Sequence, residues 1–193
     1  MLDDAARDSL FRNARSHSAW TGRAVAEATL HELYDLLKWA PTNANCSPGR
    51  LLFLCTPEAK QRLVPALSAG NVAPTLAAPV TAIVARDPLF YEQLPRLYPH
   101  GEARAWFAAN PALAEETARR NATLQGAYLI LAARSLGLDC GPMSGFDNAR
   151  VDAEFFAQSG WRSDFLVNLG YGDGAALPPR DPRLAFDEAC RLL

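Results

Sequence analysis

Residues 113–147 read LAEETARRNATLQGAYLILAARSLGLDCGPMSGFD and contain the longest helical pattern in the chain. Small and apolar residues recur along it at helical spacing: Ala118, Ala122, Leu129, Ala132 and Leu136. Glu115 and Glu116 precede them, where the dipole of a helix favours negative charge. About 22 residues at about 1.5 Å each make a rod of about 33 Å, the width of a small domain. The stretch therefore predicts a helix at the centre of a core or of a subunit interface.

The second half of this helix and the segment after it carry further signals. Nearly every position from 126 to 133 is apolar or small, which predicts that this half is buried all round. Gly137 is expected to end the helix in the left-handed conformation. Residues 138–147 are rich in glycine and proline, so we expect a turn whose backbone can approach something flat or anionic.

The composition is that of a globular domain with nearly balanced charge. The 193 residues are 49% hydrophobic, and 19 basic and 21 acidic residues leave a net charge of −2. We therefore expect one domain over residues 1–193 and no nucleic-acid partner, because no basic surface is encoded. No apolar run is long enough to span a membrane, so no membrane partner is expected. The four cysteines form no Cys-x-x-Cys pair, which favours reduced thiols, no metal site and a cytoplasmic protein.

Hydrophobic periodicity predicts several helices and about four strands, and hence a mixed fold of the α+β class. The clearest expected strands are residues 51–55, 79–85 and 165–169. Besides the long helix, residues 3–15, residues 151–156 and a C-terminal segment with Phe186, Ala189 and Leu193 are expected to be helical. Thr29 and Glu32 form a capping box that opens another helix, which has Leu30, Leu33, Leu37 and Ala40 buried and ends at Pro41. A further helix begins at Thr56-Pro57 and is kinked or ended by Pro65.

Two polar loops each allow an ordinary and a functional interpretation. Arg15, Ser16 and Ser18 lie in a loop that is either exposed or an anion site, since guanidinium, hydroxyl and backbone N–H groups suit a phosphate. Residues 41–48, PTNANCSP, form either a surface loop or a set of donors and acceptors suited to a heteroaromatic edge. Cys46 has no nearby base, which favours a packed thiol over a nucleophile.

Residues 87–112 interrupt the regular pattern with aromatic, proline and basic residues. They are either a packed excursion of short helices or a lid over a pocket, in which Arg104 or His100 would recognise an acidic substrate. The alternate glycines of residues 170–174 do not have the spacing of a dinucleotide-binding fingerprint. No Ser-His-Asp set, metal cluster or pair of carboxylates stands out, so the residue pattern alone indicates no reaction.

Four stretches together carry a resemblance to a known family. They are residues 38–48 (KWAPTNANCSP), 78–85 (APVTAIVA), 137–147 (GLDCGPMSGFD) and 168–173 (NLGYGD). In this order and at these separations, they resemble the nitroreductase-like flavoenzymes over nearly the whole chain. Asn-Cys-Ser-Pro, Gly-Pro-Met-Ser-Gly-Phe-Asp and residues 98–101 look most like the malonic semialdehyde reductases of bacterial pyrimidine utilisation.

The resemblance implies a three-layer α+β fold with a central antiparallel sheet and a long central helix. It also implies a homodimer joined through that helix, with FMN at the dimer interface. By position, the resemblance implies FMN contacts from the N-terminal segment with Arg15, Ser16 and Ser18, and from a loop that in the family often reaches the flavin of the other subunit, with Pro41, Thr42, Asn43 and Asn45. The turn against the isoalloxazine ring would be Pro142, Met143, Ser144 and Gly145. The basic residue on the phosphate would be Arg180, with Arg183 as second candidate.

The activity that the resemblance implies is an FMN-dependent, ping-pong NAD(P)H oxidoreductase that reduces malonic semialdehyde to 3-hydroxypropionate in pyrimidine degradation. Arg104 or His100 would hold the substrate carboxylate. Two alternatives stay open: a nitro- or quinone-reducing enzyme on the same scaffold, and a non-catalytic dimer whose flavin site has decayed. Ser18 and Pro178 or Pro179 stand where many family members carry basic residues, so we expect FMN to bind less tightly than in typical nitroreductases.

Overall fold

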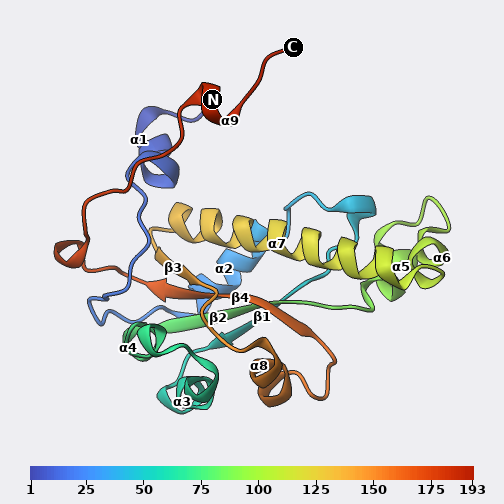
Figure 1. Ribbon diagram of the computed structural model, residues 1–193, viewed down its shortest axis with the longest axis horizontal. Helices are drawn as coiled ribbons and strands as arrows, with labels where there is room; N and C mark the ends of the chain where they lie inside the picture. Colours follow the sequence, from blue (N-terminus) through green and yellow to red (C-terminus); the bar gives the residue numbers. More distant parts are fainter.

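A four-stranded antiparallel sheet forms the middle layer of the structure, a computed structural model that describes residues 1–193 (Figure 1). Its strands are β1 (Gly49–Leu54), β2 (Val80–Arg86), β3 (Asp139–Met143) and β4 (Arg162–Gly170), in the spatial order β1-β2-β4-β3. The central strands β2 and β4 contain the predicted strands 79–85 and 165–169, and β2 is buried along its length up to Arg86. Continuous apolar runs predicted these two strands because both faces of each are covered.

Helices cover both faces of the sheet: α2 and α7 lie on one face, and α3, α4 and α8 lie on the other (Figure 1). The helices and short helical turns are α1 (Asp4–Arg7), η1 (Asp8–Arg12), α2 (Glu27–Leu37), η2 (Asn43–Asn45), α3 (Pro57–Leu63), η3 (Val64–Ala66), α4 (Ala69–Ala77), η4 (Phe90–Gln93), α5 (Leu94–Leu97), α6 (Ala103–Ala108), α7 (Pro111–Ser135), α8 (Asn148–Phe155), η5 (Gly174–Ala176) and α9 (Phe186–Ala189). The expected three-layer α+β fold with a long central helix is confirmed. None of the helices combines the length and the hydropathy that crossing a membrane requires.

The long helix α7 is set by residues at both of its ends. It begins two residues before the predicted stretch, because Asn110 caps it by accepting a hydrogen bond from the N–H of Leu113 at 3.1 Å and Pro111 occupies its first turn. The predicted end at Gly137 is confirmed, with a φ of 75°. The N–H groups of Gly137 and of the next residue donate to carbonyls of the last helical turn at 3.1 and 2.9 Å, which is the Schellman arrangement.

The prediction that residues 126–133 are buried all round is wrong for the single chain. The sheet and α2 cover one side of α7, and the opposite side faces outward with Ala127 exposed. Leu113, Leu124 and Tyr128 on that outer side retain 39%, 45% and 37% of their accessible surface. The helix therefore has a buried face and an exposed outer face, which carries these apolar side chains as well as the ion pair of Glu116 and Arg120.

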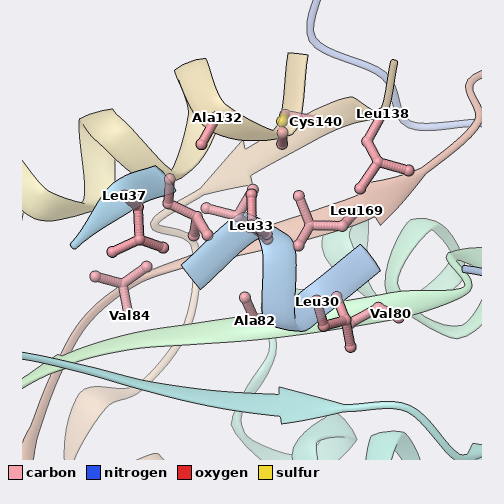
Figure 2. Close-up of a cluster of buried hydrophobic side chains, with 13 residues drawn as sticks. Leu30, Leu33, Leu37, Val80, Ala82, Val84, Ala132, Leu138, Cys140 and Leu169 are labelled. Carbon is pink, nitrogen blue, oxygen red and sulfur yellow. The ribbon is translucent and has the colours of Figure 1, made fainter. Parts of the chain in front are cut away.

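The largest group of buried side chains lies between α2, α7 and the sheet. Figure 2 shows Leu30, Leu33 and Leu37 of α2 within this cluster, together with side chains from β2, β4 and the chain after α7. The predicted buried stripe of this helix is thereby confirmed. Its predicted start is wrong: Ala26 is the N-cap, and Thr29 lies inside the first turn with its N–H on the carbonyl of Ala26 at 3.0 Å.

The two edge strands differ from prediction. Residues 51–55 were expected to be a buried strand, but β1 spans residues 49–54 at an open edge and only Leu54 is fully buried. Residues 138–147 were expected to form a turn, but the first half of that segment is β3, paired with β4. Pro142 lies inside β3, which an edge strand tolerates because one of its sides needs no ladder hydrogen bonds.

On the far face of the sheet, the predicted helix beginning at Thr56-Pro57 is confirmed. The Thr56 hydroxyl oxygen accepts from the N–H of Ala59 at 3.2 Å. The helix ends before Pro65, which lies in the short turn η3. The predicted helix at residues 151–156 is also present, as the last part of α8.

The two ends of the chain project away from the three layers and lie near each other (Figure 1). The expected helix over residues 3–15 is only α1 and η1, and Phe11 on it is 55% exposed. The expected C-terminal helix is only the four residues of α9, where Phe186 is 59% exposed. Both amphipathic predictions are wrong in extent, because the apolar residues of these segments have nothing to pack on within one chain.

Residues 87–112 form η4, α5 and α6, which pack on the N-terminal half of α7. Phe90 and Phe107 are buried, and their ring centroids lie 5.0 Å apart in an edge-to-face arrangement. Trp106 stays on the surface with 54% of its area exposed. The segment consists of short packed helices, and whether it acts as a lid over a pocket stays a prediction.

Candidate functional site

The N-terminal segment that carries the expected anion-binding residues lies flat against the ends of β3 and β4. Ser16 bridges Cys140 of β3, and the N–H of His17 donates to the Cys140 carbonyl at 2.9 Å. Two glycines allow this approach: a Cβ atom at Gly141 would lie 2.3 Å from the His17 carbonyl oxygen, and one at Gly172 would lie 2.0 Å from His17 Nδ1. The glycine-rich stretches of the sequence therefore serve the seating of this segment.

His17 is a buried residue of the site to which the sequence analysis gave no role. Its Nε2 lies 3.4 Å from Oδ1 of Asp139, and the other carboxylate oxygen of Asp139 accepts from the N–H of Gly172 at 2.9 Å. Nδ1 of His17 is buried without a hydrogen-bond partner. The serine and arginine neighbours drew attention because of their anion chemistry, whereas the burial of His17 arises only from the tertiary fold.

Two guanidinium groups flank this segment with no carboxylate beside them. Arg15 Nη2 donates to the carbonyl of Pro178 at 2.6 Å, and Arg180 Nη2 donates to the carbonyls of Arg12 and Ala14 at 2.9 and 3.0 Å. The N-terminal segment and the C-terminal arm therefore hold each other's arginines. Neither positive charge is paired with a carboxylate, so both guanidinium groups are available to bind a phosphate group.

The other expected residues at this end differ in their contribution. Ser16 and Ser18 are exposed on the same segment, so their hydroxyl groups are accessible. Arg183 donates only to the neighbouring carbonyls of Asp181 and Pro182, on the exposed arm. The structure therefore brings Arg15, Ser16, Ser18 and Arg180 together on crossing segments and does not connect Arg183 to them.

The expected flavin turn follows β3 and offers two free backbone donors. The carbonyl of Gly145 accepts from Ser68 N and from Asn71 Nδ2, each at 2.9 Å, which fixes the turn. Met143 Sδ accepts from the hydroxyl of Thr75 at 3.7 Å. The N–H groups of Ser144 and Gly145 donate to no acceptor in the protein, and Pro142 and Ser144 are exposed. Free amides suit the carbonyl and ring-nitrogen edge of a flavin, so the residues present fit FMN.

The polar loop at residues 41–48 has an unusual and firmly held backbone. Ala44, Asn45 and Ser47 have φ values of 48°, 50° and 39°, which side-chain-bearing residues rarely adopt. Asn43 N donates to Asn121 Oδ1 and Asn45 Nδ2 donates to the carbonyl of Leu97, both at 2.8 Å. These bonds keep the loop in one conformation.

The hydroxyl of Thr42 completes this arrangement by accepting from the N–H of Ser47 at 3.1 Å. Pro41 precedes it and is exposed. Cys46 is fully buried, and burial raises its pKa to about 11, so the thiol is protonated at neutral pH. The packed-thiol interpretation is confirmed, and Cys46 is no nucleophile.

The two halves of the expected flavin site do not meet within one chain. The loop at residues 41–48 is anchored to Asn121, while the segment at residues 15–18 is anchored to β3, beyond the end of α7 at Ser135. The helix rises by about 21 Å from Asn121 to Ser135, over 14 residue steps of about 1.5 Å each. The two sets of expected flavin-binding residues are therefore anchored at separate places along one chain.

Arg104 and His100, the expected substrate residues, lie on the excursion. Arg104 forms a two-pronged ion pair with Glu92, with N–O distances of 2.8 and 2.8 Å, which holds the pKa of that carboxyl below its ordinary value. The His100 ring contacts the ring of Tyr98 edge-on, at a centroid distance of 5.8 Å. Neither side chain lines the cavity of about 1090 Å³ between α2, β1 and the excursion.

Comparison with known proteins agrees with this geometry. The sequence model of the Nitroreductase family matches residues 11–171 of this chain. A Burkholderia lata protein, named provisionally as an NADH dehydrogenase/NAD(P)H nitroreductase, is 62% identical over 191 residues, covering 99% of this chain and 98% of its own.

Solved structures agree in fold at lower identity. A provisionally named nitroreductase of Bacillus subtilis is 20% identical with a TM-score of 0.89, covering 99% of this chain and 100% of its own. One of Exiguobacterium sibiricum, solved in complex with FMN, is 18% identical with a TM-score of 0.86, covering 100% of this chain and 98% of its own. The matched residues 11–171 and the Burkholderia relative together show that this chain belongs to the nitroreductase family.

Proposed function

We propose that the protein is an FMN-dependent NAD(P)H oxidoreductase. The observation that carries this proposal is the uncompensated pair Arg15 and Arg180, together with the free N–H groups of Ser144 and Gly145, which follow the strand β3 on which the Arg15 segment is seated. A flavin mononucleotide needs an anion site and backbone donors of this kind. The FMN in the Exiguobacterium structure and the nicotinamide cofactor in the name of the Burkholderia relative support both cofactors.

Each group of this chain has a definite task in that proposal. Arg15, Arg180 and the hydroxyls of Ser16 and Ser18 hold the phosphate. Ser144 and Gly145 donate their N–H groups to the polar edge of the ring system, where negative charge gathers on reduction. When bound, FMN supplies the two-electron chemistry, because it takes a hydride from a nicotinamide and gives it to a second substrate.

A homodimer supplies the missing half of the site. The outer face of α7 carries Leu113, Leu124 and Tyr128 as exposed apolar side chains, and Phe11 and Phe186 are exposed on the projecting ends. Faces of this kind mark protein–protein contacts. Pairing two copies antiparallel along α7 would move the loop at residues 41–48 of one copy toward the turn after β3 of the other.

For the second substrate we infer malonic semialdehyde, reduced to 3-hydroxypropionate. The sequence resemblance of residues 45–48, 98–101 and 141–147 supports this substrate, which combines an aldehyde with a carboxylate. A nitro or quinone compound is the second candidate, and the name of the Burkholderia relative favours it. The ratio of turnover on semialdehydes to turnover on nitroarenes distinguishes the two candidates.

The cofactor proposal is tested by titrating the purified protein with FMN. We expect saturable quenching of flavin fluorescence at one FMN per chain, and a yellow dimer on gel filtration in the presence of FMN. Arg180→Gln should weaken FMN binding by about 10- to 100-fold, since one charged hydrogen-bond partner of the phosphate is lost. Arg183→Gln is the matched control and should bind FMN as the wild type does.

Because only two guanidinium groups face the phosphate, extended dialysis should remove the flavin. Flavin retained through exhaustive dialysis would contradict this expectation of weak binding. A protein that fails to bind FMN at any concentration would overturn the oxidoreductase proposal. It would favour the third alternative, a dimer with a decayed flavin site.

A further inference from the structure

A large cavity opens between α2, β1 and the excursion, beside the loop at residues 41–48. Its volume is about 1090 Å³, and 12 of its 23 lining residues are hydrophobic. A cavity of this size and composition accommodates a small organic molecule. This loop, called the flavin loop below, forms part of the cavity rim through Asn45 and Ser47. In the proposed dimer the loop contacts a flavin, so a molecule bound in the cavity would lie beside that flavin.

The charged groups on the wall of this cavity are mostly neutralised by neighbours. Lys38 and Arg50 lie 2.6 and 2.7 Å from aspartate oxygens. The His31 ring lies 3.6 Å from Glu27, the one acidic residue of the wall. Any anion attracted to these three positions would compete with a carboxylate that is already in place.

Arg96 is the exception. Its Nη2 donates to the neutral side-chain amide of Gln93 at 3.3 Å, and no carboxylate lies within 4.0 Å of it. The short helix α5 that carries Arg96 is fixed at both ends: Leu94 is 1% exposed, and the carbonyl of Leu97 accepts from Asn45 of the flavin loop at 2.8 Å. The backbone of α5 is therefore fixed next to the loop, and it carries the exposed Arg96 side chain without a carboxylate partner.

Arg104 offers no comparable group. Both of its prongs are occupied by Glu92, and it lies outside the cavity wall. A substrate carboxylate could reach the Arg104 guanidinium only by displacing Glu92, whereas Arg96 has only a neutral amide beside it.

We propose that Arg96 is the specificity-determining residue that binds the anionic group of the second substrate. It selects short oxo acids, or other acceptors that carry a carboxylate, over neutral acceptors of the same size. The carboxylate pairs with the guanidinium and the reducible carbon points toward the flavin loop. This inference rests on the proposed oxidoreductase function and replaces the expectation that Arg104 or His100 has this role.

The test compares matched anionic and neutral acceptors with the FMN-loaded protein and NADPH. The pairs are malonic semialdehyde with propanal, and 4-nitrobenzoate with 4-nitrobenzamide. Arg96→Ala should raise KM for the anionic member of each pair by about 10- to 100-fold and leave KM for the neutral member within about twofold. Arg96→Lys should restore part of the loss, because it returns the charge without the planar fork.

Binding provides a second readout without turnover. Calorimetric titration with 3-hydroxypropionate should show the same loss of affinity in Arg96→Ala. Arg162→Ala removes an exposed arginine that has no carboxylate partner and lies outside the cavity, and it should match the wild type in every assay.

Three results would overturn the assignment of Arg96: an unchanged KM for the anionic acceptors, an equal rise for both members of a pair, or the selective effect in Arg104→Ala instead. Failure of the proposed aldehyde substrate looks different. The wild type would then reduce neither semialdehyde nor propanal, while the nitrobenzoate and nitrobenzamide pair and the calorimetry would still decide the role of Arg96.

Discussion

At the residue scale, the position of the N-terminal segment that carries Arg15 depends on two glycines that carry no charge themselves. Gly141 and Gly172 leave room for His17, and through it for the whole segment at residues 15–18, to lie on the ends of β3 and β4. Any side chain at Gly172 would occupy the space of the His17 ring. Packing and cofactor affinity are therefore coupled at this position.

Gly172→Ala should lower the free energy of unfolding by about 1–3 kcal/mol, because a Cβ atom 2.0 Å from His17 Nδ1 forces the buried ring to move. FMN affinity should fall by about tenfold as Arg15 is displaced with the segment. Gly174→Ala is the matched control, since nothing lies within 4 Å of a Cβ atom there. Urea unfolding and flavin titration measure both effects. Equal behaviour of the two variants would show that the N-terminal segment is not seated as described.

The chemistry of the site could be predicted in part from residue types. Arg15 was expected on an anion because guanidinium groups bind phosphate, and Arg180 was expected there from the family resemblance. The structure places both on crossing segments without carboxylates. Arg104 was favoured over Arg96 for a substrate carboxylate because the sequence does not reveal that Glu92 occupies it. Ion pairs between residues 12 apart in the chain depend on how two short helices meet, which residue spacing does not specify.

At the element scale, α3 and α4, which lie on the face of the sheet opposite α7, are joined by a buried lysine. Lys60 of α3 is 6% exposed, and its amine donates to the carbonyls of Leu76 at 3.0 Å and of Ala78, at the end of α4. The last carbonyls of a helix have no partners inside it, so a cation from a neighbouring helix both satisfies them and matches the dipole. α4 in turn holds the flavin turn through Asn71.

Lys60→Met keeps the length and apolar stem of the side chain but leaves both carbonyls without their donor. We expect the free energy of unfolding to fall by about 2–3 kcal/mol. Lys38→Met is the control, because Lys38 pairs with exposed Asp35 on the surface and should cost less than about 1 kcal/mol. Chemical unfolding of both variants gives the comparison. A loss below about 0.5 kcal/mol for Lys60→Met would contradict the proposed role of the lysine.

The elements that could be predicted are those whose sequence pattern is complete within the element. β2, β4 and α7 have continuous or periodic apolar residues, and α7 ends at Gly137, which adopts the left-handed conformation. β3 could not be predicted, because Asp-Cys-Gly-Pro-Met has no strand pattern and becomes a strand only by pairing with β4. α2 begins before its apparent capping box, since Ala26 already provides the first turn with an acceptor.

At the scale of the whole molecule, one chain has two half-sites and several apolar surfaces without cover. The loop at residues 41–48 is anchored near the middle of α7, at Asn121, whereas the segment at residues 15–18 is anchored to β3, beyond the C-terminal end of that helix. Leu124 and Tyr128 on the outer face of α7 lie between them, one helical turn apart. If α7 forms the dimer contact, a substitution on α7 that prevents dimer formation must also weaken flavin binding.

Leu124→Asp combined with Tyr128→Asp should convert the dimer to a monomer, because the two changes place four uncompensated charges against each other across a two-fold contact. The monomer should keep its fold, since both residues face away from the core, and circular dichroism should match the wild type. FMN affinity should fall by at least tenfold, because the partner's loop no longer reaches the flavin. Leu89→Asp, at an exposed position away from α7, should stay dimeric and yellow. Light scattering at several concentrations, with flavin titration of the same samples, distinguishes the outcomes. A double variant that is monomeric yet binds FMN as the wild type does would show that each chain completes its own site.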